Sequence, residues 1–257
     1  MPEGHIVHGV ARDLAELVDR PISVTSPQRR FPTESFHDST VVTVEAFGKH
    51  LLIDMSTEES IHVHLGMRGK WLRFSPVTGS AMPQVRLRLA APPEVAWDLV
   101  APTRCEVFDR PAKASLITRL GPDPLRSDAD PLEARRRIAS FSGSVGAALL
   151  DQSVVAGVGN VFRAEALHAC RIAPTRPARA LSADELDALW LVLVDMMSRA
   201  LDEGRIITAD AEDRLSLPEE ESRRVYKRSA CFDCGTPIEV REVSGRTAYW
   251  CPNCQPD

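Results

Sequence analysis

Four cysteines near the carboxyl end of the chain constrain its fold more than any other feature. They follow the pattern Cys231-x2-Cys234-x16-Cys251-x2-Cys254, within the last 27 residues. Each Cys-x2-Cys pair can present two sulfurs from one tight turn, so two pairs can surround a single zinc ion tetrahedrally. Because four protein thiolates leave no coordination position open, we expect one structural Zn²⁺ rather than a hydrolytic one. The 16 residues between the pairs are enough for a two-stranded hairpin with Gly245 near its bend.

The composition supports this interpretation of the cysteines. Hydrophobic residues make up 44% and charged residues 26% of the 257 residues, which is typical of a soluble globular protein and excludes a disordered chain. No apolar run approaches the roughly 20 residues of a membrane span, and the amino terminus lacks the features of a signal peptide. We therefore expect a cytoplasmic protein, in which the six cysteines serve as metal ligands or buried thiols rather than disulfides. Four unrelated thiols are the alternative to a zinc site.

The formal net charge of −5 at first argues against a nucleic-acid partner, which usually binds a basic surface. The negative balance comes from one segment, however, because residues 202–221 carry eight acidic and only two basic side chains. Residues 222–257 have a balance of +2, so local basic surfaces remain compatible with the sequence. We expect the acidic stretch around residues 208–222 to form a long mobile loop.

The period of the hydrophobic pattern divides the chain into two parts. Apolar residues recur every three or four positions over residues 7–18, which predicts a helix. After Pro21 the period becomes two, with Gly48-Lys49 as a hairpin turn, and many short strands with Gly or Pro breaks favour an antiparallel sandwich. The expected strands include residues 42–44, 52–55, 60–74, 84–89, 95–100 and 105–108. Helical periodicity then predicts helices at residues 131–141, 145–152, 160–170 and 182–203.

A glycine-rich turn precedes Asn160. Gly157 and Gly159 permit positive φ, and Asn160 is a favoured N-cap residue. Exposed amide groups at such a helix start attract a phosphate through hydrogen bonds and the helix dipole. Arg246, at the bend of the predicted zinc hairpin, can bridge two phosphate oxygens with its guanidinium group. The alternatives are an ordinary capped helix pair and a solvated surface arginine.

Four motifs together resemble the formamidopyrimidine-DNA glycosylase and endonuclease VIII family of base-excision repair enzymes, and this resemblance covers nearly the whole chain. It implies a bifunctional DNA glycosylase and abasic-site lyase that grips damaged DNA between a sandwich lobe and a helical plus zinc lobe. Each motif alone would be weak evidence, whereas the combination is specific. The motifs are Pro2-Glu3-Gly4, Leu65-Gly66-Met67, the helix-two-turn-helix segment from Leu149 to Glu165, and the segment from Gly245 to Gln255.

The resemblance and the hydrophobic pattern together predict an α+β multidomain protein. We expect an N-terminal catalytic antiparallel β-sandwich with flanking helices at residues 1–120, followed by a linker at 121–125. A helical helix-two-turn-helix DNA-binding domain with the acidic loop would occupy residues 126–222. A C-terminal four-cysteine zinc finger with a β-hairpin would occupy residues 223–257. The expected protein is a monomer, associated with the nucleoid in the cytoplasm and with no membrane partner.

In this family the initiator methionine is removed, and the resemblance assigns the nucleophile to the secondary amine of Pro2. Attack on the sugar C1′ gives an iminium that has no N–H to lose and therefore stays cationic as an electron sink. That sink promotes strand cleavage by β,δ-elimination. The ordinary pKa of an α-amine is about 8, and the positive end of the first helix should lower it. Glu3 would protonate the ring oxygen and shuttle protons, the alternative being a glutamate that stabilises the helix dipole.

The resemblance also assigns residues that contact DNA. Lys49 would neutralise a phosphate beside the flipped nucleotide, and His64 would contact the DNA backbone. Met67 would be a wedge that fills the gap left by the extruded base. Asn160 and Arg246 would clamp phosphates near the lesion. The alternatives are a solvated turn lysine for Lys49 and a buried core methionine for Met67.

The chain departs from the family pattern at two places. His5 and Ile6 replace a Pro-Glu pair that often follows the opening tripeptide, so His5 is interpreted either as a substitute proton shuttle or as a helix-surface histidine. The residues that usually contact the opposite strand as a wedge are not recognisable, and Arg104 is the one candidate for this role. Reduced contacts to the opposite strand would suit single-stranded, bubble or fork DNA.

Gly4 in the opening tripeptide resembles the endonuclease VIII side of the family, which favours oxidised pyrimidines. Two rival hypotheses remain. The chain could be a catalytically silent DNA-binding or repair-scaffold protein, or a zinc-ribbon module for protein contacts.

Overall fold

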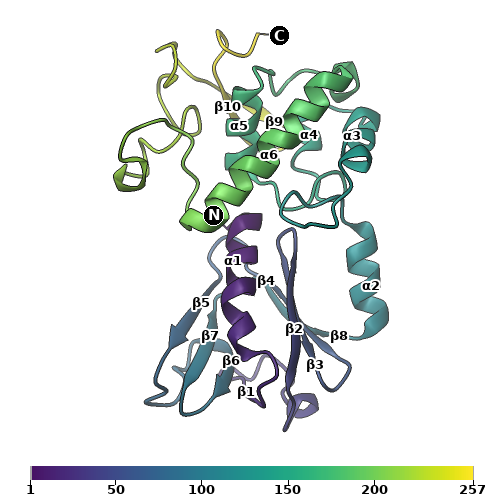
Figure 1. Cartoon of the computed structure of the whole chain (residues 1–257), viewed down its shortest axis with the longest axis vertical. Coiled ribbons are helices and arrows are strands. Elements are labelled where there is room, and N and C mark those ends of the chain that lie inside the picture. The colour runs from purple at the N-terminus through teal and green to yellow at the C-terminus, as the bar shows by residue number, and fades with distance from the viewer. Residues whose placement is uncertain (1, 257) are drawn as a thin grey trace. The chain divides into compact units, whose positions relative to one another are not determined.

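In a computed structural model that describes residues 2–256, the chain divides into two compact units between Arg119 and Leu120. The first unit contains all strands from β1 to β8 and the helices α1 and α2 (Figure 1). The second unit contains the helices α3 to α6 and the hairpin of β9 and β10. Within the described residues, no helix combines the length and the apolar character needed to cross a membrane.

The first unit is a sandwich of two four-stranded antiparallel sheets, with strand orders β1-β6-β7-β5 and β2-β3-β4-β8. Side chains alternate along each strand, so Leu51 and Ile53 of β3 enter the core while His50 and Asp54 lie on the outer face of their sheet. The predicted antiparallel sandwich is therefore confirmed. The strands are β1 Ser23–Thr25, β2 Val41–Phe47, β3 His50–Met55, β4 Ser60–His64, β5 Lys70–Phe74, β6 Val85–Ala91, β7 Val95–Val100 and β8 Arg104–Phe108.

The helix α1 (Gly4–Leu14) packs on β2 and β3. Val7, Ala11 and Leu14 recur at spacings of four and three, and all three are buried in the sandwich core. A 3-10 turn, η1 (Ala15–Leu17), continues the helix. The amphipathic pattern of residues 7–18 thus predicted this element correctly.

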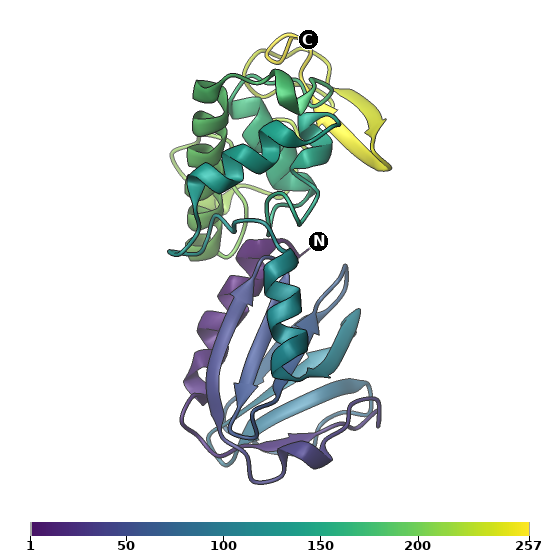
Figure 2. The same cartoon turned by 90° about the vertical axis from the view of Figure 1, so that its right-hand side faces the viewer.

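The helix α2 (Arg110–Arg119) was not predicted. Only Leu116 of its ten residues is buried, so it lacks the apolar stripe that reveals a helix in a sequence. Polar contacts hold it instead, because Asp109 accepts a hydrogen bond from the Ala112 amide at 2.8 Å and Lys113 Nζ lies 2.5 Å from Asp54 Oδ2. Figure 2 shows this helix beside the strands of the first unit.

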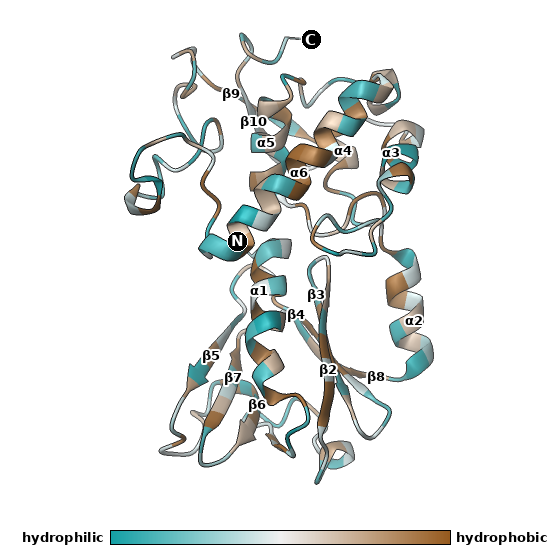
Figure 3. Ribbon diagram, viewed as in Figure 1, coloured by the Kyte–Doolittle hydropathy of each residue, from teal (hydrophilic) through white to brown (hydrophobic). Residues whose placement is uncertain are grey.

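In the second unit, the helix α6 (Ala183–Glu203) carries the predicted apolar stripe. Figure 3 shows apolar residues recurring along this helix between hydrophilic ones. Ser182 and Glu185 form a reciprocal capping box at its start, and Gly204, with φ of 71°, ends it in the left-handed conformation. The other helices are α3 Pro131–Ser140, α4 Val145–Ala148 and α5 Asn160–Ala169, and the hairpin strands are β9 Glu239–Val243 and β10 Arg246–Trp250.

Two predicted elements differ from the structure. The helix expected at residues 145–152 ends at Ala148, because Asp151 bonds through its side chain to the Ser153 amide at 2.9 Å and starts a turn. The strand expected at residues 60–74 is split into β4 and β5 by the turn at Gly66, whose φ is 67°.

The acidic segment is hydrogen-bonded to arginines at several points. It contains a short 3-10 turn, η4 (Arg214–Ser216). Arg205 Nη2 donates to the Leu217 carbonyl at 2.7 Å, and Arg214 Nη2 donates to the Ile207 carbonyl at 2.8 Å. The two basic side chains of this segment therefore fold it back on itself.

Candidate active site and metal centre

The amino-terminal residues Pro2 and Glu3 lead directly into α1. Glu3 has the N-cap position, with extended backbone angles, and its side chain has no exposed surface. It makes no capping hydrogen bond to the amides of α1. Pro2 is half-buried. A carboxyl group is thus buried beside the residue predicted to carry the reactive amine. The interpretation of His5 as a helix-surface histidine is wrong, because its side chain is buried.

Lys49 lies in a two-residue turn, since Phe47 pairs with His50 across the β2-β3 hairpin. Gly48 has φ of 60°, as the first position of a type II′ turn requires. The turn places Lys49 next to the start of β3, and its side chain is half-buried.

His64 ends β4 and pairs with His50 of β3 and Arg104 of β8. The Gly66 amide donates to His64 Nδ1 at 3.2 Å, so the neutral ring carries its proton on Nε2. Burial lowers the pKa of His64, and the positive charges of Lys49 and Arg104 lower it further. His64 is therefore a neutral N–H donor next to two cationic side chains, a combination that can bind a phosphate oxygen.

Met67 lies in the turn between β4 and β5, and 72% of its surface is exposed. The interpretation of Met67 as a core methionine is therefore wrong. The turn needs glycine at position 66, because a Cβ there would lie 1.7 Å from Thr103 Oγ1. Arg104 is also exposed, with Nη1 3.8 Å from Glu106 Oε1. The structure thus gathers Lys49, His64 and Arg104 at one end of a sheet.

In the second unit, the sequence suggested that Asn160 is the N-cap of its helix, but this prediction is wrong. Gly159 is the N-cap of α5, with φ of −121°. Of the two glycines in this turn, Gly157 has a positive φ, of 87°, and Gly159 does not. The Asn160 side chain has another role, because Nδ2 donates to the Thr247 carbonyl of β10 at 2.9 Å. Arg246 is the adjacent residue, and its side chain is exposed. The structure therefore brings together the two residues predicted to clamp phosphates.

Two buried charged residues of α5, missed by sequence reasoning, support this arrangement. Arg163 is 1% exposed and donates from Nη2 to both the Thr247 carbonyl, at 2.7 Å, and Asn160 Oδ1, at 2.5 Å. Glu165 is fully buried and accepts hydrogen bonds from three consecutive amides of residues 224–226, at 2.7 to 3.0 Å. It also accepts from the Thr208 hydroxyl. A charge in the middle of an otherwise apolar helix is the sequence feature that could have revealed them.

The four predicted ligands Cys231, Cys234, Cys251 and Cys254 form one cluster. Their sulfur atoms all lie within 4.8 Å of one another, and individual separations are 3.4, 3.5 and 3.9 Å. Zn–S bonds of about 2.3 Å in a tetrahedron would separate the sulfurs by about 3.8 Å. The donor set and its spacing therefore fit a tetrahedral metal ion that prefers thiolates.

Comparison with known proteins identifies the family of the chain. Residues 1–102 match the formamidopyrimidine-DNA glycosylase N-terminal domain, and residues 120–211 match the H2TH domain of the same glycosylase. The chain is 40% identical to Endonuclease 8 1 of Mycobacterium tuberculosis over 268 positions, covering 99% of this chain and 100% of that protein. The chain belongs to the formamidopyrimidine-DNA glycosylase and endonuclease VIII family. The family predicted from the four motifs is therefore confirmed.

Two further proteins are similar to the chain, one in sequence and one in fold. Formamidopyrimidine-DNA glycosylase of Zymomonas mobilis is 29% identical, with 99% of this chain and 100% of that protein covered. The fold is similar to that of Lactococcus lactis Fpg, solved in a complex with DNA that contains N7-benzyl-Fapy-dG. That likeness has a TM-score of 0.80 at 22% identity and covers 100% of both chains. Family members are DNA glycosylases with abasic-site lyase activity, so the predicted enzyme class is confirmed.

This member of the glycosylase family also has a polar group that sequence reasoning missed. His50, His62 and Glu106 are linked by hydrogen bonds on the outer face of the β2-β3-β4-β8 sheet, where His50 follows Lys49 directly. His62 and Glu106 are 44 residues apart in the chain. No local pattern joins them, and only the strand register could have predicted their contact.

Proposed function

We propose that this DNA glycosylase excises oxidised bases, with pyrimidines preferred, and cuts the strand through a Schiff base on Pro2. The observation that carries the proposal is the Glu3 carboxyl group, which is fully buried immediately after Pro2. Burying a carboxyl group is costly, so its position calls for a role beyond stabilising a helix end. An acid next to a secondary amine suits glycosylase chemistry.

The proposed reaction begins when the Pro2 nitrogen, freed by removal of Met1, attacks the sugar C1′. Met1 lies outside the described residues. The bond between C1′ and the base breaks, and the base leaves with the bonding electrons and takes up the proton that the attacking nitrogen loses. Glu3 protonates the ring oxygen, the sugar opens, and the nitrogen lone pair forms an iminium with C1′. Loss of a C2′ proton then feeds electrons toward the iminium and expels the 3′ phosphate, and a second elimination expels the 5′ phosphate.

We further propose that both units supply residues to the same damaged DNA. In the first unit, the neutral N–H donor of His64 and the charge of Lys49 would bind phosphates next to the flipped nucleotide. The exposed Met67 would occupy the space that the flipped base leaves. In the second unit, Asn160 and Arg246 would hold phosphates near the lesion. Arg104, exposed at the end of β8, is the candidate contact to the opposite strand.

The four-cysteine cluster is proposed to hold one structural Zn²⁺. When bound, the ion would cross-link the segment of Cys231 and Cys234 to that of Cys251 and Cys254, which flank the hairpin carrying Arg246. All four positions around it would be thiolates, so the proposed reaction uses no metal-bound water. The zinc finger would comprise residues 223–257, following a catalytic domain at 1–120, a linker at 121–125 and a helical domain at 126–222.

The family resemblance supports three finer proposals about the setting of the reaction. The substrate would be a lesion in single-stranded, bubble or fork DNA, because the usual opposite-strand wedge residues are not recognisable in this sequence. The enzyme would act as a monomer, associated with the nucleoid in the cytoplasm. Cleavage assays of a thymine-glycol lesion in single-stranded, bubble and duplex DNA test the first of these, and stronger cleavage of duplex DNA would contradict it.

Borohydride trapping tests the covalent step. Protein whose intact mass shows complete loss of Met1 should form a reducible cross-link to an abasic or thymine-glycol oligonucleotide. An amino-terminal tag should abolish it, because the Pro2 nitrogen is then an amide. Glu3→Gln should remove glycosylase activity more severely than cleavage at an abasic site, by about 10²- to 10⁴-fold. Glu34→Gln, a change at a carboxylate of η2 (Glu34–Phe36), is the control.

The outcomes separate the rival hypotheses. Fully processed protein that binds lesion DNA but never forms an adduct would refute the lyase mechanism and favour a catalytically silent scaffold. Protein with no preference for damaged DNA would favour a zinc-ribbon module for protein contacts. Pro2→Gly keeps a terminal amine but makes it primary, so partial activity is expected.

A further inference from the structure

The outer face of the β2-β3-β4-β8 sheet carries a row of stacked rings. The His50 ring lies edge-on to His64 with centroids 5.1 Å apart, and stacks on His62 at 5.1 Å. His62 in turn stacks on Phe108 at 4.4 Å. The register places these residues on adjacent strands, with His50 opposite His64 and His62 opposite Glu106. The row therefore extends inward from the end of the sheet at which Lys49 and His64 lie.

Hydrogen bonds along this row fix the protonation sites of two rings. His62 Nδ1 lies 3.1 Å from Glu106 Oε1, and a carboxylate can only accept, so His62 donates from Nδ1. The other nitrogen of neutral His62, Nε2, is then an acceptor, and it lies 2.9 Å from His50 Nδ1. His50 therefore donates from Nδ1. We call this hydrogen-bonded chain of Glu106, His62 and His50 the relay. When both histidines are neutral, His50 Nε2 carries the ring lone pair that neither of these two hydrogen bonds uses.

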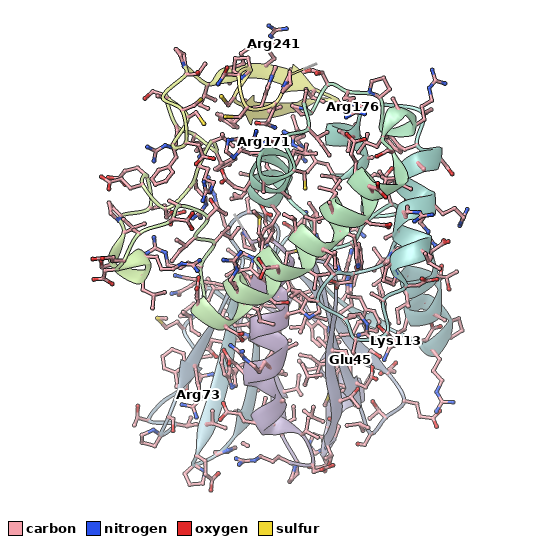
Figure 4. All side chains as sticks on the ribbon, turned by 45° about the horizontal axis from the view of Figure 1, so that its top comes forward. Glu45, Arg73, Lys113, Arg171, Arg176 and Arg241 are labelled. Carbon is pink, nitrogen blue, oxygen red and sulfur yellow. The ribbon has the colours of Figure 1, made fainter. Side chains whose placement is uncertain are left out.

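A second polar group on the same face contains two acids, Asp54 and Glu45, and one lysine, Lys113. Asp54 accepts hydrogen bonds from Ser60 Oγ at 2.6 Å and Thr43 Oγ1 at 2.9 Å, and it pairs with Lys113 of α2. Figure 4 shows Lys113 next to Glu45 of β2, and the ion pair between them measures 3.8 Å. Lys113 thus contacts both acids of this group. At the other end of the face, Lys49 and Arg104 both act on His50, and Glu106 is the acidic member of the relay.

We propose that His50 takes up a proton on Nε2 when a DNA phosphate binds between Lys49 and His64, with Glu106 stabilising the new charge through His62. This inference rests on the proposed function, since it needs DNA at Lys49 and His64. The proton comes from solvent and adds to the free lone pair, so no bond in the relay has to break. His64 is unsuited to this role, because protonating its Nδ1 would remove the acceptor of the Gly66 amide.

The electrostatics agree with the geometry of the relay. Burial lowers the pKa of His50 to about 3, and the neighbouring His62, His64, Arg104 and Lys49 add to this effect. A phosphate would offset the charges of Lys49 and Arg104 and so raise the pKa of His50 in the complex. Because the pKa of His50 rises when DNA binds, the affinity for DNA must increase once the pH falls below the pKa of His50 in the complex. The increase is up to about tenfold per pH unit.

The experiment measures binding of the full-length enzyme to an oligonucleotide with a tetrahydrofuran abasic analogue, which it cannot cleave by attack at C1′. Kd is determined at constant ionic strength from about pH 5 to about pH 8, because phosphate contacts are strongly salt-dependent. Titration calorimetry in two buffers of different ionisation enthalpy counts the protons taken up.

Three variants and a control make the test specific. His50→Phe keeps a ring in the row but removes the proton acceptor, so proton uptake should fall and the affinity should depend less on pH. His62→Phe and Glu106→Gln leave His50 in place and should shift the pH dependence to lower pH. His37→Gln, at an exposed histidine paired with Asp38, should behave as wild type.

Each outcome has a defined meaning. If the wild type does not bind the oligonucleotide at all, at every pH tested, the proposed function is wrong. If the wild type binds and His50→Phe or Glu106→Gln retains the same pH dependence and proton count, the relay proposal is overturned while DNA binding stands. Circular dichroism of each variant checks the fold, and Glu106→Gln, at a partly exposed side chain, provides a result even if His50→Phe unfolds.

Discussion

The two units hold their candidate residues in different ways. In the first unit, Lys49, His64 and Arg104 lie in or beside hydrogen-bonded strands, and the register of β2, β3, β4 and β8 sets their spacing. In the second unit, Asn160 and Arg246 come from a helix and a short hairpin that share no sheet. The connection depends on Arg163 and Glu165, both buried in α5, and on the cysteine cluster.

This difference determines how sensitive the candidate residues of each unit are to a single change. A sheet distributes its stability over many backbone hydrogen bonds, so a side chain on its outer face can be lost without moving the strands. A buried charge is costly once its partners are lost, and a four-thiolate site fails as a whole without its ion. Single changes should therefore disturb the second unit more than the first.

Removal of the proposed zinc should give the largest effect. Chelation, or Cys231→Ser, should abolish the structure of residues 223–256, since structural zinc contributes about 10–16 kcal/mol of apparent free energy in isolated fingers. Amide hydrogen exchange should show loss of protection in β9 and β10, with β3 and β4 unchanged. Cys170→Ser, outside the cluster, is the control. Equal loss of protection in both units would contradict the expectation that the second unit is the more sensitive one.

The buried carboxylate of Glu165 should give the next largest effect. Glu165→Gln places an NH₂ group where backbone amides need an acceptor, and we expect a loss of about 3–5 kcal/mol in the free energy of unfolding. Affinity for DNA should fall as well, because residues 224–226 precede the hairpin that carries Arg246. Urea unfolding and DNA binding measure the two quantities.

A matched variant in the first unit is Asp98→Asn. Asp98 is fully buried and holds Arg88 through two hydrogen bonds, of 2.6 and 2.8 Å, between β6 and β7. Its sheet does not contain Lys49 or His64. We expect a similar loss of about 3–5 kcal/mol in stability with unchanged affinity for DNA under native conditions. Weaker DNA binding by folded Asp98→Asn would show that the first unit is no more tolerant than the second.

The sequence predicted features whose evidence is local. The Cys-x2-Cys spacing located the metal cluster, and the apolar periodicity of residues 7–18 and 182–203 located α1 and α6. Alternation of apolar residues likewise predicted most strands of the sandwich.

Features set by contacts between distant residues could not be predicted in this way. The helix α2 depends on Lys113 reaching Asp54, 59 residues away. Asn160 looked like a helix cap because its type favours that position, but its side chain bonds to Thr247, 87 residues away. The relay of His50, His62 and Glu106 arises from strand register, which the hydrophobic pattern does not define on a polar face.

The titration of His50 in the first unit should give a smaller effect on stability. The ordinary pKa of histidine is about 6.5, and in the folded unit the pKa of His50 is lowered to about 3. The unfolded chain therefore binds the proton first as pH falls, so stability is present above about pH 6.5 and is lost toward pH 3. Between about pH 6.5 and pH 4.5 this amounts to about 2 kcal/mol.

Urea unfolding at these two pH values, compared between wild type and His50→Phe, isolates this effect. The variant should lose less stability on acidification, although its stability at neutral pH can differ. An identical pH dependence in both proteins would mean that His50 titrates normally and that the polar face of the sheet has no influence on it.

The helix cap of α6 should give the smallest effect. Ser182 Oγ accepts from the Glu185 amide at 3.2 Å, and Glu185 Oε2 accepts from the Ser182 amide at 2.7 Å. Ser182→Ala should therefore cost about 1 kcal/mol in urea unfolding of the second unit, with Ser35→Ala in the first unit as the control. This cap is near the surface, where water replaces the lost partner, whereas Glu165 is fully buried. If Ser182→Ala cost as much as Glu165→Gln, the sensitivity of the second unit would come from its helices in general and not from its few buried charges.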